Sequence, residues 1–314
     1  MFSAAKQWVT NMTGIGQGAI SPEAFETFWS ECTSIHADSP TRFYKEVLNK
    51  FQKQDRRDIH SLSDDSTYDP ATKVRFVCTS DTHNQTDRYN FQVPDGDVLI
   101  HGGDFTQVGC VKEVEHFADW LDTLPHPIKI VIAGNHELSF DPMTASDPNI
   151  RERLIGRLHK SCTYLEDNSA VVSGIKIFGS PWQPLFGNWG YNLKRGEECA
   201  AKWKEIPDNT DILITHGPPI GHGDRVRNGI RAGCVDLLQE IQLRVKPQYH
   251  IFGHIHEDAG VTTDGQTTFI NASMCTLRYK PEQYPVVFEM DKISEETILV
   301  SAPAEWNLSD PRKK

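Results

Sequence analysis

The fold of this chain is decided by residues 74–83, VRFVCTSDTH. The run Val74–Thr79 is rich in β-branched and aromatic side chains, which predicts a buried strand. An acid, Asp81, and an imidazole, His83, follow where that strand ends. Four further apolar runs lead into polar clusters in the same way. These clusters are Gly103-Asp104, Gly134-Asn135-His136-Glu137, Thr215-His216-Gly217 and Gly253-His254-Ile255-His256.

The side chains in the five clusters are carboxylates, imidazoles and one amide, with no thiolate among them. This mixture suits Mn²⁺, Fe or Zn²⁺ better than Ca²⁺ or a closed structural zinc site. Two such cations, roughly 3.5–4 Å apart, can hold the attacking and leaving oxygens of a displacement at phosphorus. The sequence therefore predicts a phosphoester hydrolase with two divalent metal ions, Mn²⁺ foremost and Fe or Zn as alternatives.

Strand-rich and helical segments alternate from residue 73 onward, which indicates α/β units. The predicted strands are Val74–Thr79, Val98–Ile100, Ile128–Ala133, Ile175–Phe178, Ile212–Thr215, Tyr249–Phe252, Thr267–Ile270, Val286–Met290 and Thr297–Ser301. The predicted helices lie between Gly103 and Ile128 and at Ile150–His159, Glu197–Ile206 and Val235–Val245. Each polar cluster falls at the carboxyl end of a strand, where open α/β sheets bind their ligands.

The order of the clusters resembles the calcineurin-like metallophosphoesterase superfamily, whose pattern is D-x-H, G-D, G-N-H-[DE], H and G-H-x-H. The resemblance spans roughly residues 74–300. The sequences of residues 76–83, 132–138 and 215–219 are similar to those of the metallophosphoesterase-domain-containing proteins of animals. It implies a four-layer α/β/β/α sandwich, in which helices flank two mixed sheets.

The resemblance also implies a role for each residue. One metal would take Asp81, His83, Asp104 and His256, and the second would take Asp104, Asn135, His216 and His254. The nucleophile would be a bridging hydroxide, because metal coordination lowers the pKa of water from 15.7 to about 7. His136 would contact the phosphoryl oxygens or protonate the leaving group. Glu137 would orient its neighbours rather than bind metal.

Charge favours a phosphodiester as the substrate. Two divalent cations, the carboxylates of Asp81 and Asp104 and one hydroxide leave a single positive charge, which a diester monoanion would neutralise. A phosphomonoesterase, including a protein phosphatase, is the alternative enzyme, and a nucleotide-binding scaffold without catalysis is the alternative from another class. His254 stands where some relatives have glycine, which favours a complete two-metal centre and turnover.

Several other histidines and aromatic residues could either pack in the core or line the substrate site. His101, directly after the predicted strand Val98–Ile100, and His250, inside the predicted strand Tyr249–Phe252, are predicted to be hydrogen-bonded core histidines. His222 follows the His216 cluster, so a place at the substrate rim is an alternative to a core position. Three aromatics of the Pro- and Gly-rich segment after residue 180 would either stack on a nucleobase or pack their loop, with Trp182 the candidate for the rim. These are Trp182, Trp189 and Tyr191.

Composition limits the partners and the compartment. The formal net charge of -11 argues against an extended nucleic-acid surface, which needs many Lys and Arg contacts to phosphates. Seven cysteines without a C-x-x-C pair indicate reduced thiols, and the N-terminus lacks the apolar core of a secretion signal. We therefore expect a cytoplasmic protein without a membrane span, acting on a small phosphorylated substrate. The sequence predicts no particular protein partner.

Three segments are predicted along the chain. Residues 1–72 form an N-terminal extension with two helices, one starting at Ser21-Pro22-Glu23 and one at Ser39-Pro40-Thr41. Residues 73–302 form the catalytic domain, and residues 303–314 form a tail. Phe43, Val47 and Leu48 recur at helical spacing, and such a stripe packs on the parent domain or, alternatively, binds a separate partner.

Overall fold

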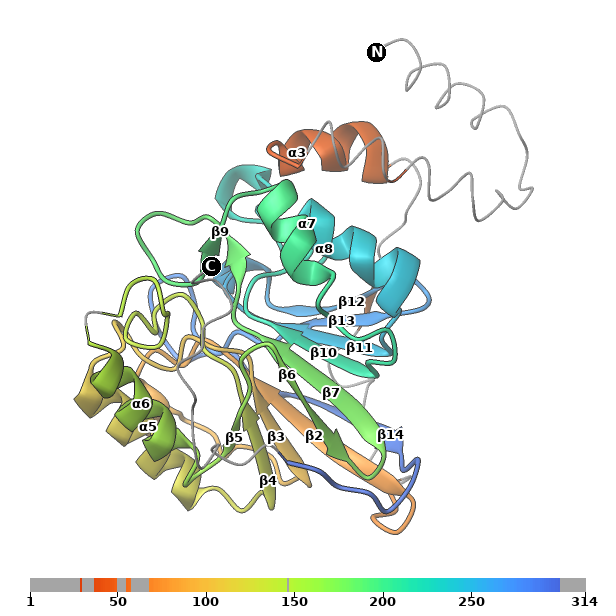
Figure 1. The fold of residues 1–314 in the computed structure, drawn as a ribbon. Coiled ribbons are helices and arrows are strands. Elements are labelled where there is room, and N and C mark those ends of the chain that lie inside the picture. The colour runs from red at the N-terminus through yellow and green to blue at the C-terminus, as the bar shows by residue number, and fades with distance from the viewer. Residues whose placement is uncertain (1–28, 30–36, 50–54, 58–67, 146, 300–314) are drawn as a thin grey trace.

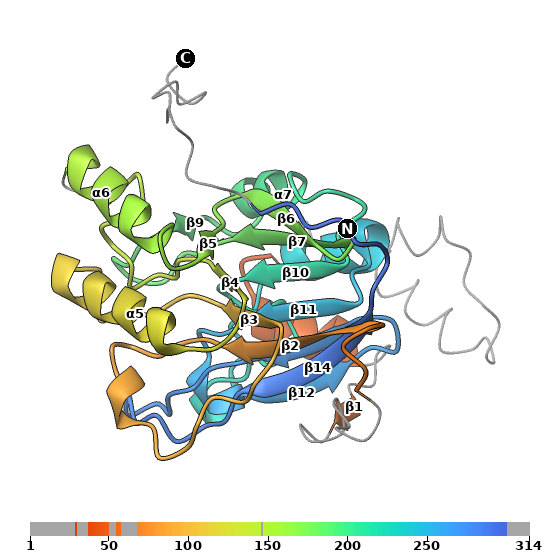
Figure 2. The ribbon, with the colours of Figure 1, turned by 90° about the horizontal axis from the view of Figure 1, so that it is seen from below.

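The computed structural model describes residues 29, 37–49, 55–57, 68–145 and 147–299. Two mixed sheets face each other within this part of the chain (Figures 1 and 2). In spatial order, one sheet holds β1 (Asp55–Arg57), β12 (Gly260–Thr263), β13 (Thr268–Asn271), β11 (Tyr249–Phe252), β10 (Ile212–Thr215), β7 (Ile175–Ser180) and β6 (Asn168–Val172). The other holds β14 (Val286–Asp291), β2 (Lys73–Thr79), β3 (Val98–His101), β4 (Ile128–Val131) and β5 (Thr163–Tyr164).

Within each sheet, the strands that lead to the polar clusters run parallel to one another. In one sheet β2, β3, β4 and β5 pair in parallel, and in the other β7, β10, β11 and β13 do. The remaining pairings, with β14, β12, β1 and β6, are antiparallel. A short parallel pair, β8 (Gln183–Pro184) and β9 (Asn192–Leu193), stands apart from both sheets. Parallel strands bring their carboxyl ends to one edge, so the clusters gather there.

Helices cover the outer faces of both sheets. Figure 1 shows α5 and α6 beside the sheet of β2–β5, and α7 and α8 over β10 and β11. The helices are α5 (Val111–Thr123), α6 (Pro148–Leu158), α7 (Glu197–Trp203), α8 (Val235–Glu240) and the π-helix η5 (Ile241–Val245) that continues α8. Short 3₁₀ turns are η3 (Thr86–Arg88), η4 (Arg227–Gly229) and η6 (His256–Asp258). The predicted four-layer sandwich is confirmed.

Local sequence explains where α5 and α6 begin. The Glu113 carboxylate accepts hydrogen bonds from the backbone N–H groups of Cys110 and Val108, at 3.2 and 3.1 Å, and so caps α5. The Asp147 carboxylate accepts from the backbone N–H of Asn149 at 2.9 Å, with Pro148 as the first residue of α6. Between the sheets, Tyr249 of β11 stacks on Phe288 of β14 at 3.8 Å, which fixes one sheet on the other.

The described part of the extension joins the sandwich. The helix predicted from Ser39 is present as α3 (Pro40–Phe43) and the π-helix η1 (Tyr44–Leu48). Its Phe43, Val47 and Leu48 are buried in the hydrophobic core, which favours packing on the parent domain. Strand β1 adds an antiparallel edge to β12. The helix predicted from Ser21 and the tail 303–314 lie outside the described residues.

One predicted strand is wrong in its described part. Of Thr297–Ser301, residues 297–299 are described, and they form a single isolated bridge, between Ile298 and Val171. Exposed Ile298 and Leu299 follow the polar run 294–297, so this segment lies against the edge strand β6 without a continuous ladder. No helix in the described residues is long and apolar enough to cross a membrane.

Candidate metal centre

Five strand ends from two sheets bring the polar clusters together. Asp81 follows β2, Asp104 follows β3 and Asn135 follows β4, while His216 and His254 follow β10 and β11. A bridge between Ser80 and Ser273 joins the two sheets at this edge. The ligand candidates separated by up to 175 positions in sequence thus share one place, because Asp81 Oδ1 and His256 Nε2 lie 3.1 Å apart.

The backbone at this edge is bent into conformations that side chains rarely adopt. Asp81, Asp104 and His254 have φ angles of 52°, 54° and 69°. Such left-handed residues cost roughly 1–3 kcal/mol each and concentrate at functional sites. Two glycines let the chains approach: a Cβ on Gly134 would overlap Asp104 Oδ1, and one on Gly253 would overlap Asp81 Oδ2.

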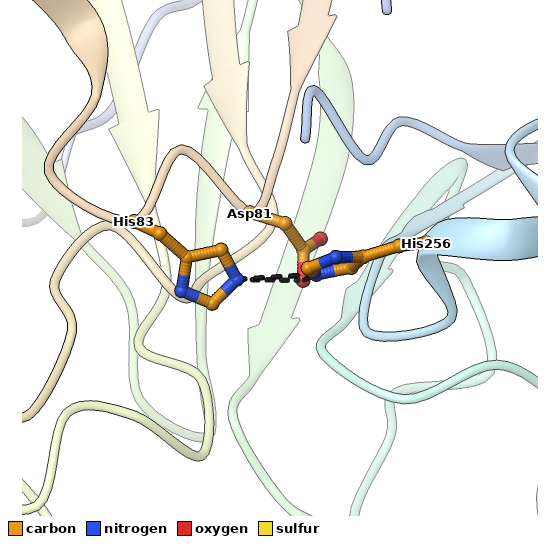
Figure 3. Close-up of side chains that lie close together, drawn as sticks. All are labelled: Asp81, His83 and His256. Carbon is orange, nitrogen blue, oxygen red and sulfur yellow. Dashed lines mark hydrogen bonds and ion pairs between the residues drawn. The ribbon is translucent and has the colours of Figure 1, made fainter. Parts of the chain in front are cut away.

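Asp81, His83 and His256 form the first group of donors (Figure 3). His83 Nε2 lies 3.1 Å from His256 Nε2, which in turn lies 3.1 Å from Asp81 Oδ1. The Nδ1 atoms of the two rings face the carbonyl oxygens of Thr106 and Thr276, at 3.2 and 3.1 Å, so each Nδ1 carries the proton. Both Nε2 atoms therefore point at one place beside a carboxylate. In the metal-free chain the hydrogen bond and charge of Asp81 oppose the effect of burial and raise the pKa of His256, so a proton on His256 Nε2 fills that place, and a divalent cation could replace it.

A second group gathers on the other side of Asp104. His216 Nε2 lies 3.3 Å from Asp104 Oδ2 and 3.0 Å from Asn135 Oδ1. His216 Nδ1 donates to the carbonyl of Gly102 at 2.9 Å, which again leaves Nε2 as a ligand atom. His254 belongs to the same cluster, with ligand atoms within 4.8 Å of those of Asp104 and His216. This set of carboxylate, amide and imidazole atoms also fits a divalent cation.

Asp104 lies between the two groups. Its Oδ2 is 3.3 Å from His216 Nε2 in the second group and 3.9 Å from His83 Nε2 in the first. Its Oδ1 accepts the backbone N–H of His136 at 2.8 Å, which fixes the orientation of the carboxylate. One carboxylate placed between two donor groups is the position that a bridging ligand requires.

Burial and charge set the protonation of the donors in the metal-free chain. Burial lowers the pKa of His83 to about 4 and that of His254 to about 3, so both rings are neutral near pH 7. Burial also acts to lower the pKa of His216, but the charge of Asp104 and its hydrogen bond raise it to about 9. Burial likewise opposes ionisation of Asp81, yet the hydrogen bond and charge of His256 hold its pKa well below the usual range.

Glu137 ties the clusters together without facing the donors. Its carboxylate accepts from the backbone N–H groups of Asp104, Thr106 and Gly134, at 2.9, 2.8 and 2.6 Å, and from the Thr106 hydroxyl at 2.7 Å. Burial and the charge of Asp104 raise the pKa of Glu137 to about 8. These contacts fit the orienting role implied for Glu137, because they hold the loop of Asp104 against the loop of Asn135.

His136 lies at the edge of the centre with its side chain 10% exposed. Nδ1 donates to the carbonyl of Gln107 at 2.6 Å, and Nε2 lies 3.9 Å from Asp104 Oδ2. The ring stacks on Trp189, with centroids 4.0 Å apart and planes 22° apart, and meets His83 edge-on at 4.6 Å. A ring nitrogen of His136 also lies within 4.8 Å of the ligand atoms of His83 and Asp104. By distance, His136 is therefore a candidate metal ligand as well as a candidate acid.

The rim positions expected for His222 and Trp182 do not fit the structure. His222 is fully buried, stacks on Phe269 at 3.7 Å and bonds through Nδ1 to the Thr262 hydroxyl at 2.9 Å. Trp182 is 4% exposed, and its indole N–H donates to Asp167 at 2.9 Å. Both rings are held in the interior by their neighbours, because these contacts and burial outweigh proximity in sequence to the clusters.

The other ambiguous side chains are also placed. His101 and His250 are buried, as predicted, and their Nε2 atoms bond to the hydroxyls of Thr82 and Thr215, at 3.1 and 2.8 Å. Tyr191 is fully buried and packs edge-on against Trp182. The remaining member of the aromatic loop, Trp189, is partly exposed and contacts His136 instead.

Two residues at the centre were not predicted from the sequence to belong to it. The Ser273 hydroxyl donates to Asp81 Oδ2 at 2.9 Å. Tyr279, with φ at 56°, places its half-exposed ring edge-on to His83 at 4.7 Å. Both come from the segment after β13, which returns to the edge of the sheets. A lone serine and a lone tyrosine in a loop have no spacing that would have indicated this.

A third group of donor atoms lies away from the five clusters. Cys199, Cys234 and Asp236 bring their ligand atoms within 4.8 Å of one another near the starts of α7 and α8. Their polar atoms already have partners: the Trp203 indole N–H points at Cys234 Sγ at 3.3 Å, and the Gly196 backbone N–H donates to Asp236 at 3.2 Å. A hydrogen bond with Cys234, together with burial, raises the pKa of the Cys199 thiol and keeps it protonated. The group is a packed hydrogen-bond cluster.

Comparison with known proteins adds to this geometry. A family model described as calcineurin-like phosphoesterase matches residues 74–258. Metallophosphoesterase domain-containing protein 1 of Homo sapiens is 44% identical over 274 residues, covering 81% of this chain and 83% of that protein, and its Mus musculus counterpart gives the same values. A UPF0046 protein of Caenorhabditis elegans is 44% identical over 233 residues, covering 69% of this chain and 81% of that protein.

Proposed function

Because the chain belongs to the calcineurin-like phosphoesterase family, it is a metal-dependent phosphoester hydrolase, and we propose that it cleaves small phosphodiesters, nucleotides among them, at a two-metal centre. One observation carries the proposal: Nε2 atoms of His83 and His256 converge beside Asp81, with both Nδ1 atoms turned to backbone carbonyls. The ends of β2 and β11, which belong to different sheets, maintain this convergence.

The ligand sets that follow share Asp104. Asp81, His83, Asp104 and His256 would hold one cation, and Asp104, Asn135, His216 and His254 would hold the other. Bound divalent cations supply an activated water and neutralise charge on the phosphoryl group. Mixed nitrogen and oxygen ligands favour Mn²⁺, with Fe and Zn²⁺ as alternatives, over Mg²⁺, which prefers oxygen alone.

His136 supplies the proton in this proposal. Its Nδ1 is committed to Gln107, so Nε2 is the atom that faces the centre. An imidazole that holds a proton at Nε2 can pass it to the leaving oxygen as the ester bond breaks. Such proton transfer contributes typically 10²–10⁴-fold in rate.

The surrounding charges support the preference for a diester. Among the described residues, the ion-pair partners of Asp81 and Asp104 are histidines, and no Arg or Lys pairs with either carboxylate. A phosphomonoester dianion needs additional cationic partners such as a bidentate arginine, whereas a diester monoanion needs fewer. The net charge of -11 likewise supports a small substrate over an extended nucleic acid.

A stripped and reconstituted enzyme tests the function. Chelator treatment should abolish turnover, and Mn²⁺ should restore it while Mg²⁺ alone restores little. Bis-p-nitrophenyl phosphate should then be cleaved with a higher kcat/KM than p-nitrophenyl phosphate, and a panel of nucleotide diesters should narrow the substrate. Faster cleavage of the monoester would favour a phosphomonoesterase or protein phosphatase. Nucleotide binding without turnover of any ester would favour the scaffold alternative.

Metal uptake should weaken as the pH falls. The neighbouring Asp104 opposes the effect of burial and holds the pKa of His216 at about 9, so metal must displace a proton from this ring at pH 7. Lower pH favours that proton, and the affinity should fall on the order of tenfold per pH unit. Burial keeps His83 neutral down to about pH 4, so it adds no competition near neutrality. Turnover should accordingly drop below about pH 6.

Calorimetry in buffers of different ionisation enthalpy measures this proton release. At pH 7 we expect about one proton released per cation bound at the second group. Equal metal affinity at pH 8 and pH 6, with no proton released, would contradict the assignment of His216 as a ligand.

We also place the protein in the cytoplasm, acting without membrane or nucleic-acid partners. The six cysteines in the described residues are free thiols. Reduced thiols are typical of intracellular proteins, and this is the support for the location.

A further inference from the structure

One side chain that binds neither a cation nor, in the proposal above, the substrate covers the face of His136. The indole of Trp189 stacks on that imidazole, with centroids 4.0 Å apart and an angle of 22° between the planes. The same imidazole is fixed at one edge by the hydrogen bond from Nδ1 to Gln107. A hydrogen bond at one atom still allows the ring to swing about that contact, whereas a stacked neighbour restricts the swing.

The loop that carries Trp189, residues 185–191, is hydrogen-bonded to the segment 135–141, which contains His136. The Gly190 backbone N–H donates to the carbonyl of Asn135 at 2.9 Å, and the Tyr191 backbone N–H donates to the Asp141 carboxylate at 2.9 Å. The Asn192 side chain donates to the carbonyl of Trp189 at 2.8 Å. These bonds fix the position of the Trp189 backbone relative to the segment that contains His136.

We propose that Trp189 is a positioning residue, whose indole holds the His136 imidazole in the orientation that delivers its proton to the leaving oxygen. This inference rests on the acid role proposed for His136. Catalytic proton transfer depends on placement, since an error of about 1 Å can cost 10²-fold. An indole is not a metal ligand, so its removal should affect proton delivery and leave the bound cations in place.

Leaving-group dependence separates this role from general damage to the site. Methyl p-nitrophenyl phosphate releases a stable anion that needs little protonation, whereas methyl phenyl phosphate releases a basic one that needs a proton. With Mn²⁺-loaded protein, Trp189→Ala should lower kcat for the phenyl ester about 10- to 100-fold and for the nitrophenyl ester by less than about threefold. KM for both esters should stay within about twofold, because the ground-state contacts remain.

Two further variants complete the test. Trp189→Phe keeps a flat ring over His136 and should recover most of the kcat for the phenyl ester. Leu185→Ala removes a side chain that is 62% exposed in the same loop and should leave both esters unaffected. An equal loss for the two esters in Trp189→Ala, accompanied by a loss of Mn²⁺, would overturn the proposal, and so would unchanged kinetics.

A spectroscopic readout is independent of turnover. A ring stacked on an indole has proton resonances shifted upfield, so NMR of the metal-free, histidine-labelled protein should show upfield-shifted signals of His136, assigned by their absence in His136→Ala. These signals should return to ordinary positions in Trp189→Ala and stay shifted in Leu185→Ala. Unshifted His136 signals in the unmodified chain would overturn the inference. If no phosphoester were hydrolysed, the proposed function would fail while this measurement would still decide whether Trp189 orients the ring.

Discussion

Replacing Asp104 by asparagine should remove both cations and reduce turnover by more than about 100-fold. In centres of this kind two divalent cations about 4 Å apart repel each other by roughly 16 kcal/mol at an effective dielectric constant of about 20. A carboxylate between them offsets part of that repulsion, and Asp104 Oδ2 lies between His83 and His216. Asparagine keeps the shape and the acceptor for the His136 backbone N–H, so the variant tests charge rather than packing.

The bound metal is measured directly, by elemental analysis after gel filtration of Mn²⁺-loaded protein. His254→Gly is the matched control, because His254 belongs to the second group alone. That variant should lose one cation and retain the other, held by Asp81, His83 and His256. If Asp104→Asn still carried two cations, the bridging position would be wrong. If His254→Gly kept both, the second ligand set would be wrong.

The central strands were predictable because they are buried on both sides, whereas their four-layer arrangement was implied by the family resemblance. β10 and β11 occupy the predicted residues, Ile212–Thr215 and Tyr249–Phe252. Short apolar runs of this kind are typical of parallel strands whose two faces are both covered. The edge strands had no comparable signal. β1 has the sequence Asp55-Arg56-Arg57, with all three side chains exposed, and is a strand only because β12 is available to pair with it. Pairing of that kind depends on tertiary structure.

The gathering of the candidate ligands could be predicted in part for the same reason. Polar residues at the ends of parallel strands of one sheet meet at one edge, whereas the meeting of Asp81 with His256, which follow strands of different sheets, was implied by the family resemblance. The contacts that support the ligands could not be predicted from the sequence. Ser273 reaches Asp81 from a later loop, and Glu137 gathers three backbone N–H groups from two loops. Such contacts follow from loop conformation, which local patterns do not fix.

The aromatic and histidine residues outside the clusters illustrate the same limit. His222 has a sequence neighbourhood much like that of a site residue, yet it is fully buried against Phe269. Trp182 and Trp189 are seven positions apart in one loop, and they separate into an interior side chain and a neighbour of His136. Which face a loop residue presents depends on its backbone hydrogen bonds, and these form only in the folded chain.

His136→Ala should lower kcat by 10²–10⁴-fold while the Mn²⁺ content stays that of the unmodified protein. The imidazole provides the proton in the proposed reaction, and alanine has none to give. Like Trp189→Ala, the variant should lose more on methyl phenyl phosphate than on methyl p-nitrophenyl phosphate. The two changes together should cost little more than His136→Ala alone, because Trp189 acts through the ring that is already absent.

The metal content of His136→Ala distinguishes a His136 that acts as the acid from a His136 that binds a cation. Its ligand atom is close enough to those of His83 and Asp104 to join a cation, but its Nε2 is 3.9 Å from Asp104 Oδ2, whereas His216 Nε2 is 3.3 Å away. If His136 is the acid, imidazole added to the alanine variant should enter the space beside Trp189 and restore part of the rate. Should the cation leave together with the activity, and imidazole restore neither, His136 is a ligand, and proton delivery must come from another group.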